Sequence, residues 1–393
     1  MDFTNRHAAP NMTHAFFKRL AALFLALMAS NAAAVTGLVI DAHTRAPVSG
    51  AIVTIDNQVT YTDANGRFAI GASGVTTVKV RSPGYLRAEA TANFNAPVTI
   101  ALPAFRPRAV YLSAYGVTNA ALREAAVKLA DETAVNALVI DMKGDRGMTP
   151  YRSHAREAIG AAAHVGEHPP TLAAFEPIVD DLRRRGLYLI ARIVVFKDDP
   201  LVLAHPEWAV LDDAGRPWTD RENLHWADPF NTDVWRHNLD VAEEAAKAGF
   251  DEIQFDYVRF PDAKGLHFSR PNTREDRTEA IVGFLSAARQ RLTRYNVFVA
   301  ADIFGYVCWN LDDTAIGQQL ETLGAPLDYI SPMLYPSGFT WGLPGCTNPV
   351  ADPAQIVRRS LAEAKRRTGL PGVRFRPWLQ AFRDYAFDRR DFG

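Results

Sequence analysis

The stretch GFDEIQFDYVRFPD, residues 249–262, decides the fold, because it is written as a strand and yet carries many polar groups. A strand of a parallel α/β sheet is covered on both faces and is normally apolar. Side chains alternate along a strand, so Ile253, Phe255 and Tyr257 are expected to face a layer of helices. The opposite face carries the polar residues Glu252, Gln254 and Asp256. The stretch therefore predicts a strand with an apolar outer face and a polar inner face, ending near Asp256.

Six further apolar runs alternate with amphipathic stretches, one of which is an expected helix over residues 233–248 with Gly249 directly after it. The runs cover residues 109–116, 136–145, 187–198, 297–306, 328–337 and 373–382. This alternation is typical of βαβ units and a parallel sheet. Seven strands point to a (β/α)8 barrel of the TIM type, which normally has eight. No candidate strand follows residue 382, so the predicted barrel lacks its last strand.

The segment from residue 35 to residue 104 has a different sequence pattern. Short β-branched runs lie between turn signals such as Asn65-Gly66 and Pro83-Gly84. This pattern predicts a small all-β sandwich. Its motifs, Pro47 to Ala51 and Thr62 to Phe68 among them, resemble the carboxypeptidase regulatory-like domain. The resemblance implies a non-catalytic spacer or adhesion module. Residues 103–108 are the expected linker to a barrel domain over residues 105–393.

Residues 1–34 have the three parts of a secretory signal peptide. Lys18 and Arg19 are followed by an apolar run and then by small residues up to Ala34, and Met12 is an alternative start. We therefore expect a secreted or periplasmic protein with no membrane span after cleavage. Its two cysteines, Cys308 and Cys346, could form a disulfide or remain as two buried thiols.

The overall charge of the chain excludes some partners. A net charge of -1, with 22% charged residues, provides no field that would attract nucleic acid. The sequence has no Cys/His spacing typical of a metal site, no G-x-S-x-G elbow and no phosphate-binding Gly-rich loop. We therefore expect neither a cofactor nor a metal, and the oligomeric state stays open.

Polar side chains recur where the predicted strands end, which in a barrel is the edge that carries the active site. Asp256 and Asp302 are the candidate catalytic pair, because two carboxylates on neighbouring strands are the usual equipment for glycoside hydrolysis. The expected substrate-binding residues are Asp141, Lys143, Arg192, Arg259, Tyr335, Trp378 and Gln380. Asp141 and Lys143 share one strand face in this prediction. Asp256 is expected to be kept ionised by Arg259, Arg192 or Lys143, whereas Asp302 has a raised pKa and donates the proton.

The strings NALVIDMKGDRG, YLIARIVVFKD, FDYVRFP, ADIFG and SPMLYPS resemble the bacterial family of putative glycosyl hydrolase domains, from about Arg108 to the end of the chain. The resemblance implies a TIM barrel, distantly similar to α-amylase-like barrels, that acts on a polysaccharide or oligosaccharide. It also implies that Asp256 is the nucleophile and Asp302 the acid/base. Asp302 stands where amylase-like enzymes have Glu, and Gln380 where they have Asp near strand seven.

Two alternatives remain open at this point. The first is a non-catalytic carbohydrate-binding or cell-envelope protein with a decayed barrel, which the missing strand and the adhesion-like module favour. The second is a metal-dependent hydrolase, since carboxylate sites suit Mg²⁺, Ca²⁺ or Mn²⁺. Its candidate ligands are Asp141, Asp145, Asp198 and Asp302. The sugar, the linkage and the stereochemical outcome are not readable from the sequence.

Overall fold

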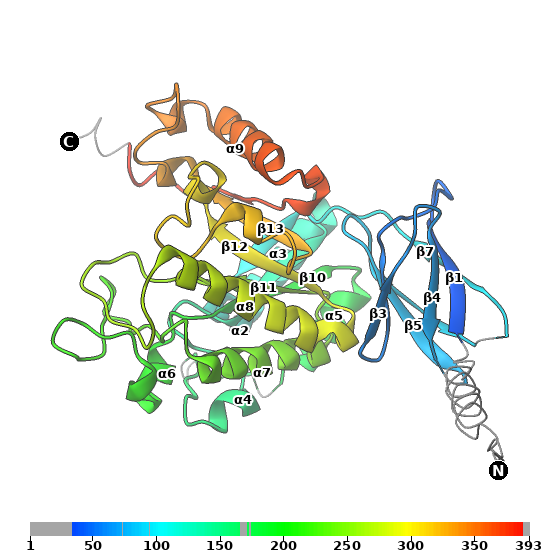
Figure 1. Cartoon of the computed structure of the whole chain (residues 1–393), viewed down its shortest axis with the longest axis horizontal. Helices are drawn as coiled ribbons and strands as arrows, with labels where there is room; N and C mark the ends of the chain where they lie inside the picture. Colours follow the sequence, from blue (N-terminus) through cyan, green and yellow to red (C-terminus); the bar gives the residue numbers. More distant parts are fainter. Residues whose placement is uncertain (1–33, 73, 94, 166–170, 173, 388–393) are drawn as a thin grey trace, which may run out of the picture.

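The computed structural model describes residues 34–72, 74–93, 95–165, 171–172 and 174–387. The predicted signal peptide lies outside these residues, except for Ala34, which begins the first strand. Figure 1 shows a β-sandwich on one side of a larger α/β unit. The protein is thus a mixed α/β protein with an all-β N-terminal part.

The β-sandwich consists of two sheets that pack face to face. One has the order β4-β1-β7 and the other the order β3-β2-β5-β6. The strands are β1 (Ala34–Asp41), β2 (Ile52–Ile55), β3 (Gln58–Tyr61), β4 (Arg67–Gly71), β5 (Thr76–Arg81), β6 (Ala88–Ala92) and β7 (Val98–Leu102). Val39, Val53 and Val80 belong to the core between them. The expected linker lies between β7 and the first strand of the larger unit.

The larger unit is a seven-stranded parallel sheet in the order β14-β13-β12-β11-β10-β9-β8. Its strands are β8 (Ala109–Leu112), β9 (Ala137–Lys143), β10 (Tyr188–Val194), β11 (Glu252–Asp256), β12 (Phe298–Phe304), β13 (Tyr329–Leu334) and β14 (Trp378–Leu379). Each coincides with one of the seven predicted runs. Within the described residues, β8 and β14 are edge strands that do not pair with each other. The sheet is a curled half-barrel, consistent with a TIM-type fold.

Helices connect the strands and cover the outer face of this sheet (Figure 1). They are α2 (Ala114–Thr118), α3 (Ala120–Glu132), α4 (His154–Glu157), α5 (Glu176–Arg184), α6 (Asp199–Ala204), α7 (Thr232–Ala248), α8 (Arg274–Leu292) and α9 (Pro353–Thr368). The 3₁₀ turns are η1 (Pro206–Trp208), η2 (Thr293–Tyr295), η3 (Gly305–Cys308), η4 (Leu320–Thr322), η5 (Pro336–Gly338), η6 (Pro349–Ala351) and η7 (Gly372–Arg374). The helix expected over residues 233–248 is α7, and Gly249 ends it with a φ of 101°.

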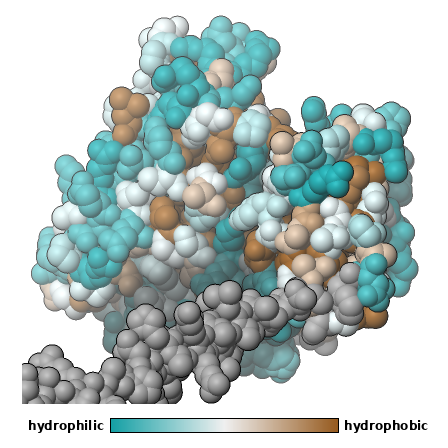
Figure 2. Space-filling model, turned by 45° about the vertical axis from the view of Figure 1, so that its right-hand side comes forward, coloured by the Kyte–Doolittle hydropathy of each residue, from teal (hydrophilic) through white to brown (hydrophobic). Residues whose placement is uncertain are grey.

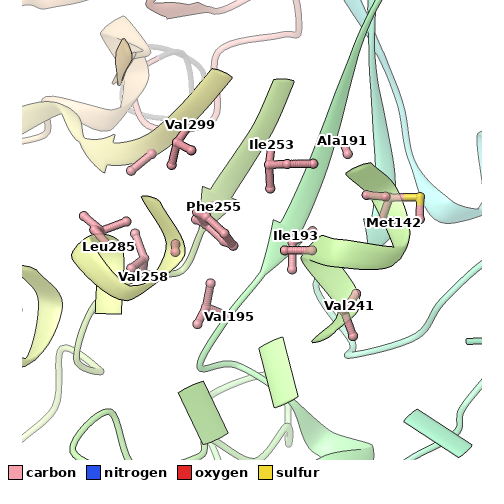
Figure 3. Packing of buried hydrophobic residues seen from close by; sticks show 14 of the residues in the cluster. Met142, Ala191, Ile193, Val195, Val241, Ile253, Phe255, Val258, Leu285 and Val299 are labelled. Atoms are coloured by element: carbon pink, nitrogen blue, oxygen red, sulfur yellow. The ribbon is translucent and has the colours of Figure 1, made fainter. Parts of the chain in front are cut away.

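The core between sheet and helices confirms the predicted alternation in β11. Ile253 and Phe255 pack in this core with Ile193, Val241 of α7 and Leu285 of α8, as Figure 3 shows. The intervening residues of β11 point to the concave face of the sheet. The apolar positions of the strands thus attach the sheet to its helices, and the polar positions are left for the concave side.

The β-sandwich closes the end of the half-barrel where its strands begin. Gly84 donates its backbone N–H to the hydroxyl of Tyr329 at 3.0 Å. Arg87 forms an ion pair with Asp251 at 3.0 Å, and Leu86 packs under the concave face. This contact leaves the opposite edge, where the strands end, free for a functional site.

Two further expectations concern the cysteines and the membrane. Cys308 and Cys346 are both free, so they form no disulfide here, and only Cys308 is buried. Burial raises the pKa of the Cys308 thiol to about 12. Among the described residues, no helix has the length and apolarity needed to cross a membrane.

Candidate active site

A cleft of about 1360 Å³ occupies the concave face of the half-barrel and reaches the C-terminal ends of the strands. Its lining includes five predicted site residues and two further polar residues of β11. The first are Arg192, Asp256, Arg259, Asp302 and Tyr335, and the second are Glu252 and Gln254. The prediction that Glu252, Gln254 and Asp256 face the barrel interior is confirmed. The cleft therefore lies where active sites of parallel α/β sheets usually lie.

Arg192 of β10 is the centre of the charge network in this cleft. Its Nη1 donates to Asp141 at 2.7 Å, its Nη2 to Asp145 at 2.7 Å, and its Nη2 and Nε to Asp256 at 2.6 and 2.9 Å. Although burial opposes it, the charge of these carboxylates raises the pKa of Arg192 above its usual value. Charge-assisted bonds of this kind are the strong ones. Arg192 thus fixes the position of Asp256 and supplies its counter-charge.

Asp302 of β12 lies beside this network but is not neutralised by it. It is 1% exposed, and its Oδ2 lies 4.0 Å from the Nε of Arg192. Burial, with the added charge of Asp256, holds the pKa of Asp302 well above its usual range. Within the part of the chain that the structure describes, Oδ2 has no hydrogen-bond partner. Asp302 is therefore the carboxyl group of this cleft whose protonated form is favoured by its surroundings.

The two distances from Arg192 to Asp256 and Asp302 set an upper limit on the separation of these carboxyl groups. Arg192 Nε lies 2.9 Å from Oδ2 of Asp256 and 4.0 Å from Oδ2 of Asp302. The two oxygens are thus at most about 7 Å apart, within reach of both the retaining and the inverting arrangement of glycoside hydrolases. A proton donor and an ionisable carboxylate at this spacing can act on one bond from two sides.

Aromatic side chains form the walls of the cleft. Trp378 of β14 donates its indole N–H to Oδ1 of Asp302 at 2.8 Å and meets the ring of Tyr111 edge-on at 5.7 Å. Tyr335 packs against Phe382 at 5.2 Å, and burial together with Asp302 raises the pKa of its hydroxyl. Flat apolar faces beside hydrogen-bonding groups suit the two faces of a sugar ring. The expected places of Tyr335 and Trp378 in the site are thus seen in the structure.

Tyr257 corrects one detail of the predicted alternation. It was expected to face the helices, but it lines the cleft. Its φ is 47°, a left-handed conformation that turns the chain at the end of β11 and ends the regular alternation. Strained backbone of this kind clusters at functional sites. Its ring lies 5.2 Å from the guanidinium of Arg259, which also stacks on Trp226 at 4.9 Å.

Lys143 is the main correction among the predicted site residues. It is fully buried outside the cleft, where its Nζ donates to Asp198 and Asn238, both at 2.6 Å. The cause is an irregularity in the pairing of β9 with β10: Arg192 pairs with Asp141, but Ile193 pairs with Lys143. The extra residue is a β-bulge, which moves Lys143 to the helix side. It cannot therefore be the cation that holds Asp256.

Gln380 and Asp141 lie outside the cleft and hydrogen-bond residues near it. Gln380 does not line the cleft; its side chain accepts from the backbone N–H of Ser337 at 3.1 Å and donates to the Ser337 hydroxyl at 2.8 Å. Asp141 is buried and accepts from Tyr111 at 2.7 Å as well as from Arg192. Burial raises the pKa of the Asp141 carboxyl in spite of the Arg192 charge. Both residues position others and do not face the cleft.

Two residues of the site were not among its predicted members: Tyr111, and Asp145, which was a candidate only in the metal alternative. Tyr111 belongs to the short strand β8, and its ring lies 5.5 Å from the guanidinium of Arg192. Asp145 comes two residues after β9, at a strand end, which is the signal that could have placed it in the cleft. Nothing in the sequence around Tyr111 distinguishes it from a packing tyrosine.

The four carboxylates of the metal alternative do not meet. Asp198 is buried with Lys143 and Arg156 outside the cleft, and Asp141 and Asp145 are bound to Arg192. Over the described residues, no group of three or more His, Cys, Asp or Glu side chains is arranged to hold a metal ion. The arrangement of this donor set therefore does not fit a metal centre.

The family model described as "Putative glycosyl hydrolase domain" matches residues 109–393, and the model described as "Carboxypeptidase regulatory-like domain" matches residues 34–105. No curated protein matches.

Similar solved structures include a hypothetical protein from Ruminiclostridium thermocellum ATCC 27405, 35% identical, with a TM-score of 0.44 over 49% of this chain and 96% of that one. They also include the PgaB (BpsB) glycoside hydrolase domain from Bordetella bronchiseptica, 17% identical, with a TM-score of 0.49 over 70% of this chain and 84% of that one.

Proposed function

The chain belongs to the family described as "Putative glycosyl hydrolase domain", and we propose that it hydrolyses glycosidic bonds of a polysaccharide. In this proposal Asp256 and Asp302 are the catalytic residues. The observation that carries the proposal is the contrast between two neighbouring carboxyl groups in one cleft. Asp256 is bound to the guanidinium of Arg192, whereas the pKa of Asp302 is held well above its usual range. Pairs of carboxyl groups whose environments differ in this way divide the roles of base or nucleophile and acid.

In the proposed mechanism the sugar ring enters between the aromatic walls of the cleft. Asp302 donates its proton to the glycosidic oxygen, which makes the departing sugar a neutral alcohol. Asp256 faces the anomeric carbon and stabilises the positive charge that develops there, either by attacking it or by activating water. Arg192 provides the counter-charge of Asp256 and holds it in place, and Trp378 fixes the orientation of Asp302. If Asp256 attacks, water then hydrolyses the glycosyl-enzyme and gives its proton back to Asp302. If Asp256 activates water, that water attacks the anomeric carbon in the same step and gives its proton to Asp256.

The proposal also covers the domain organisation and the location of the protein. We propose a signal peptide over residues 1–34, a spacer or adhesion module over 35–104 and a catalytic domain over 105–393, in a secreted or periplasmic protein. We interpret the half-barrel as part of a (β/α)8 barrel. The three-part pattern of residues 1–34 supports the location, and the parallel order of the seven described strands supports the barrel.

The experiment measures the release of reducing ends from soluble starch, dextran, β-glucan and chitin oligosaccharides. We expect cleavage of at least one of them, and a loss of about 10³-fold or more for Asp256→Asn and for Asp302→Asn. Asp131→Asn, at an exposed position of α3, is the matched control and keeps full activity. Wild-type cleavage by the Asp256→Asn enzyme would reject the assignment. Binding of a polysaccharide without any cleavage would favour the non-catalytic alternative.

A further inference from the structure

A second cavity, of about 650 Å³, lies between the β-sandwich and the half-barrel, and it shares no residue with the cleft. One wall is the sheet of β2 and β3, with Asn57 and Tyr61. The other wall is the C-terminal part of α8 with η2, followed by Ala325 and Pro326. Figure 2 shows the two lobes and a hydrophilic recess between them. We call this cavity the junction groove.

The junction groove is rich in arginine. Arg81, Arg289, Arg291 and Arg294 line it, against a single lining carboxylate, Glu243. Arg81 and Arg289 share one buried partner, Asp328, whereas Arg291 is matched by Glu243 and Asp240.

Arg294 differs from these arginines. Over the described residues it forms no ion pair, and its guanidinium lies 5.7 Å from the ring of Tyr295. Arg81 adds an Nη1 that is buried and has no hydrogen-bond partner within the described chain. The groove therefore has an excess of positive charge that the protein itself does not neutralise.

The groove also contains an aromatic ring and hydrogen-bonding side chains, which are the kinds of group that recognise sugars. Tyr61 is 57% exposed. Burial opposes the charge of Arg289, but Asp328 and then the hydroxyl of Tyr61 raise the pKa of that guanidinium, which places the Tyr61 hydroxyl near it. Hydrogen-bonding side chains surround it: Asn57, Ser286, Gln290 and Thr293. An aromatic face offers a stacking surface for a sugar ring, and amides and hydroxyls pair with its hydroxyl groups.

We propose that the junction groove is a second binding site, for an acidic oligosaccharide whose carboxylate pairs with Arg294 and whose ring stacks on Tyr61. A guanidinium binds a carboxylate in a planar, two-point geometry, which selects this group over a neutral hydroxyl. The net charge of -1 argues against a long polyanion such as nucleic acid, because the chain as a whole provides no attracting field. This site does not depend on hydrolysis in the cleft. It would hold a polymer chain through a surface that both parts of the protein form.

The test is calorimetric titration of the full chain with a trimer of galacturonate, with the neutral galactose trimer and with sodium phosphate. We expect the galacturonate trimer to bind and the neutral trimer to bind at least about fivefold more weakly, with Arg294→Gln and Tyr61→Ala each losing about fivefold to tenfold in affinity. Arg358→Gln, at an exposed position of α9, is the matched control and leaves binding unchanged. Equal binding of the neutral trimer, or unchanged binding by both groove variants, would overturn the proposal. So would phosphate binding as tight as that of the trimer, since it would indicate a simple anion site.

A second comparison separates the groove from the cleft. Trp378→Ala, in the cleft, is expected to leave galacturonate binding intact, and the two groove variants are expected to keep the wild-type rate on whichever oligosaccharide the enzyme cleaves. If Trp378→Ala abolishes galacturonate binding, the ligand occupies the cleft and the groove proposal fails. Failure of hydrolysis alone leaves the titration result standing, so the two proposals can fail separately.

Discussion

Trp378 donates its indole N–H to Oδ1 of Asp302 at 2.8 Å, and this bond determines where the proton of the acid resides. An oxygen that accepts a hydrogen bond from a ring N–H is best left without a proton. The proton therefore belongs on Oδ2, the oxygen that lies 4.0 Å from Arg192 Nε and faces the side of Asp256. Trp378 thus orients the acid toward its partner and also lowers the pKa of Asp302, against the larger effect of burial.

The substitution Trp378→Phe should move the pH profile of the reaction. Without the indole bond the pKa of Asp302 rises further, so the acid stays protonated to higher pH and the basic limb of kcat against pH shifts upward. We also expect kcat at neutral pH to fall about tenfold, because the carboxyl is less well oriented. Trp309→Phe is the control, since its indole bonds Ser360 outside the cleft. A fall in rate with an unmoved basic limb would contradict the proton assignment.

The predictable part of the site depends on regular strand geometry. Alternation placed Gln254 and Asp256 in the cleft correctly, because β11 is extended up to Asp256. It was wrong for Lys143, which follows a bulge, and for Tyr257, which has a φ of 47°. Both errors arise where the backbone leaves the extended conformation, and a bulge depends on the pairing of two strands that are distant in sequence. The seven parallel strands were predictable because each has an apolar face and they alternate with amphipathic stretches.

The raised pKa of Asp302 should make the folded protein less stable as the pH increases. The folded state retains a proton that the unfolded chain gives up near the usual carboxyl pKa of 3.8. The free energy of unfolding therefore falls as the pH rises from that value towards the folded pKa. Asp302→Asn removes this cost, because its amide oxygen can still accept from Trp378. We expect the variant to be more stable than wild type by about 1 to 2 kcal/mol at pH 7 and no more stable at pH 4, measured by urea unfolding. Equal stability of the two proteins at pH 7 would show that the pKa of Asp302 is not raised in the folded state.

Arg192 and Lys143 provide a matched pair of buried cations with different roles. Lys143→Met leaves Asp198 with both bonds from Arg156, at 2.8 and 2.9 Å, so we expect a stability loss of about 2 kcal/mol and a kcat within about twofold of wild type. Arg192→Met leaves the carboxylates in the cleft without their cation, and we expect activity to fall about 10²-fold or more. Rates should be normalised to folded protein by circular dichroism. A comparable loss of kcat for Lys143→Met would indicate that Lys143 acts on the cleft after all.

Asp328 couples the β-sandwich to the half-barrel. It is 2% exposed and lies between Arg81 of the sandwich, at 3.4 Å, and Arg289 of α8, at 3.2 Å. Burial would raise its pKa, but the charges of these arginines hold the pKa of Asp328 below its ordinary value. A lowered pKa stabilises the folded state above the unfolded pKa, and this stabilisation is lost as the pH falls through the folded pKa.

Asp328→Asn keeps the acceptor for the Val299 N–H, at 3.0 Å in the native protein, but leaves the buried guanidinium of Arg81 and the half-buried guanidinium of Arg289 without their carboxylate. We expect a loss of about 3 kcal/mol at pH 7 that shrinks as the pH falls below 4. Because the affected contact joins the two parts of the chain, thermal unfolding followed by calorimetry should separate into two transitions. Asp131→Asn, on the exposed side of α3, is the control and should leave one transition. A variant that unfolds in one transition with wild-type stability would show that the apolar contact of Leu86, and not this ion pair, holds the sandwich in place.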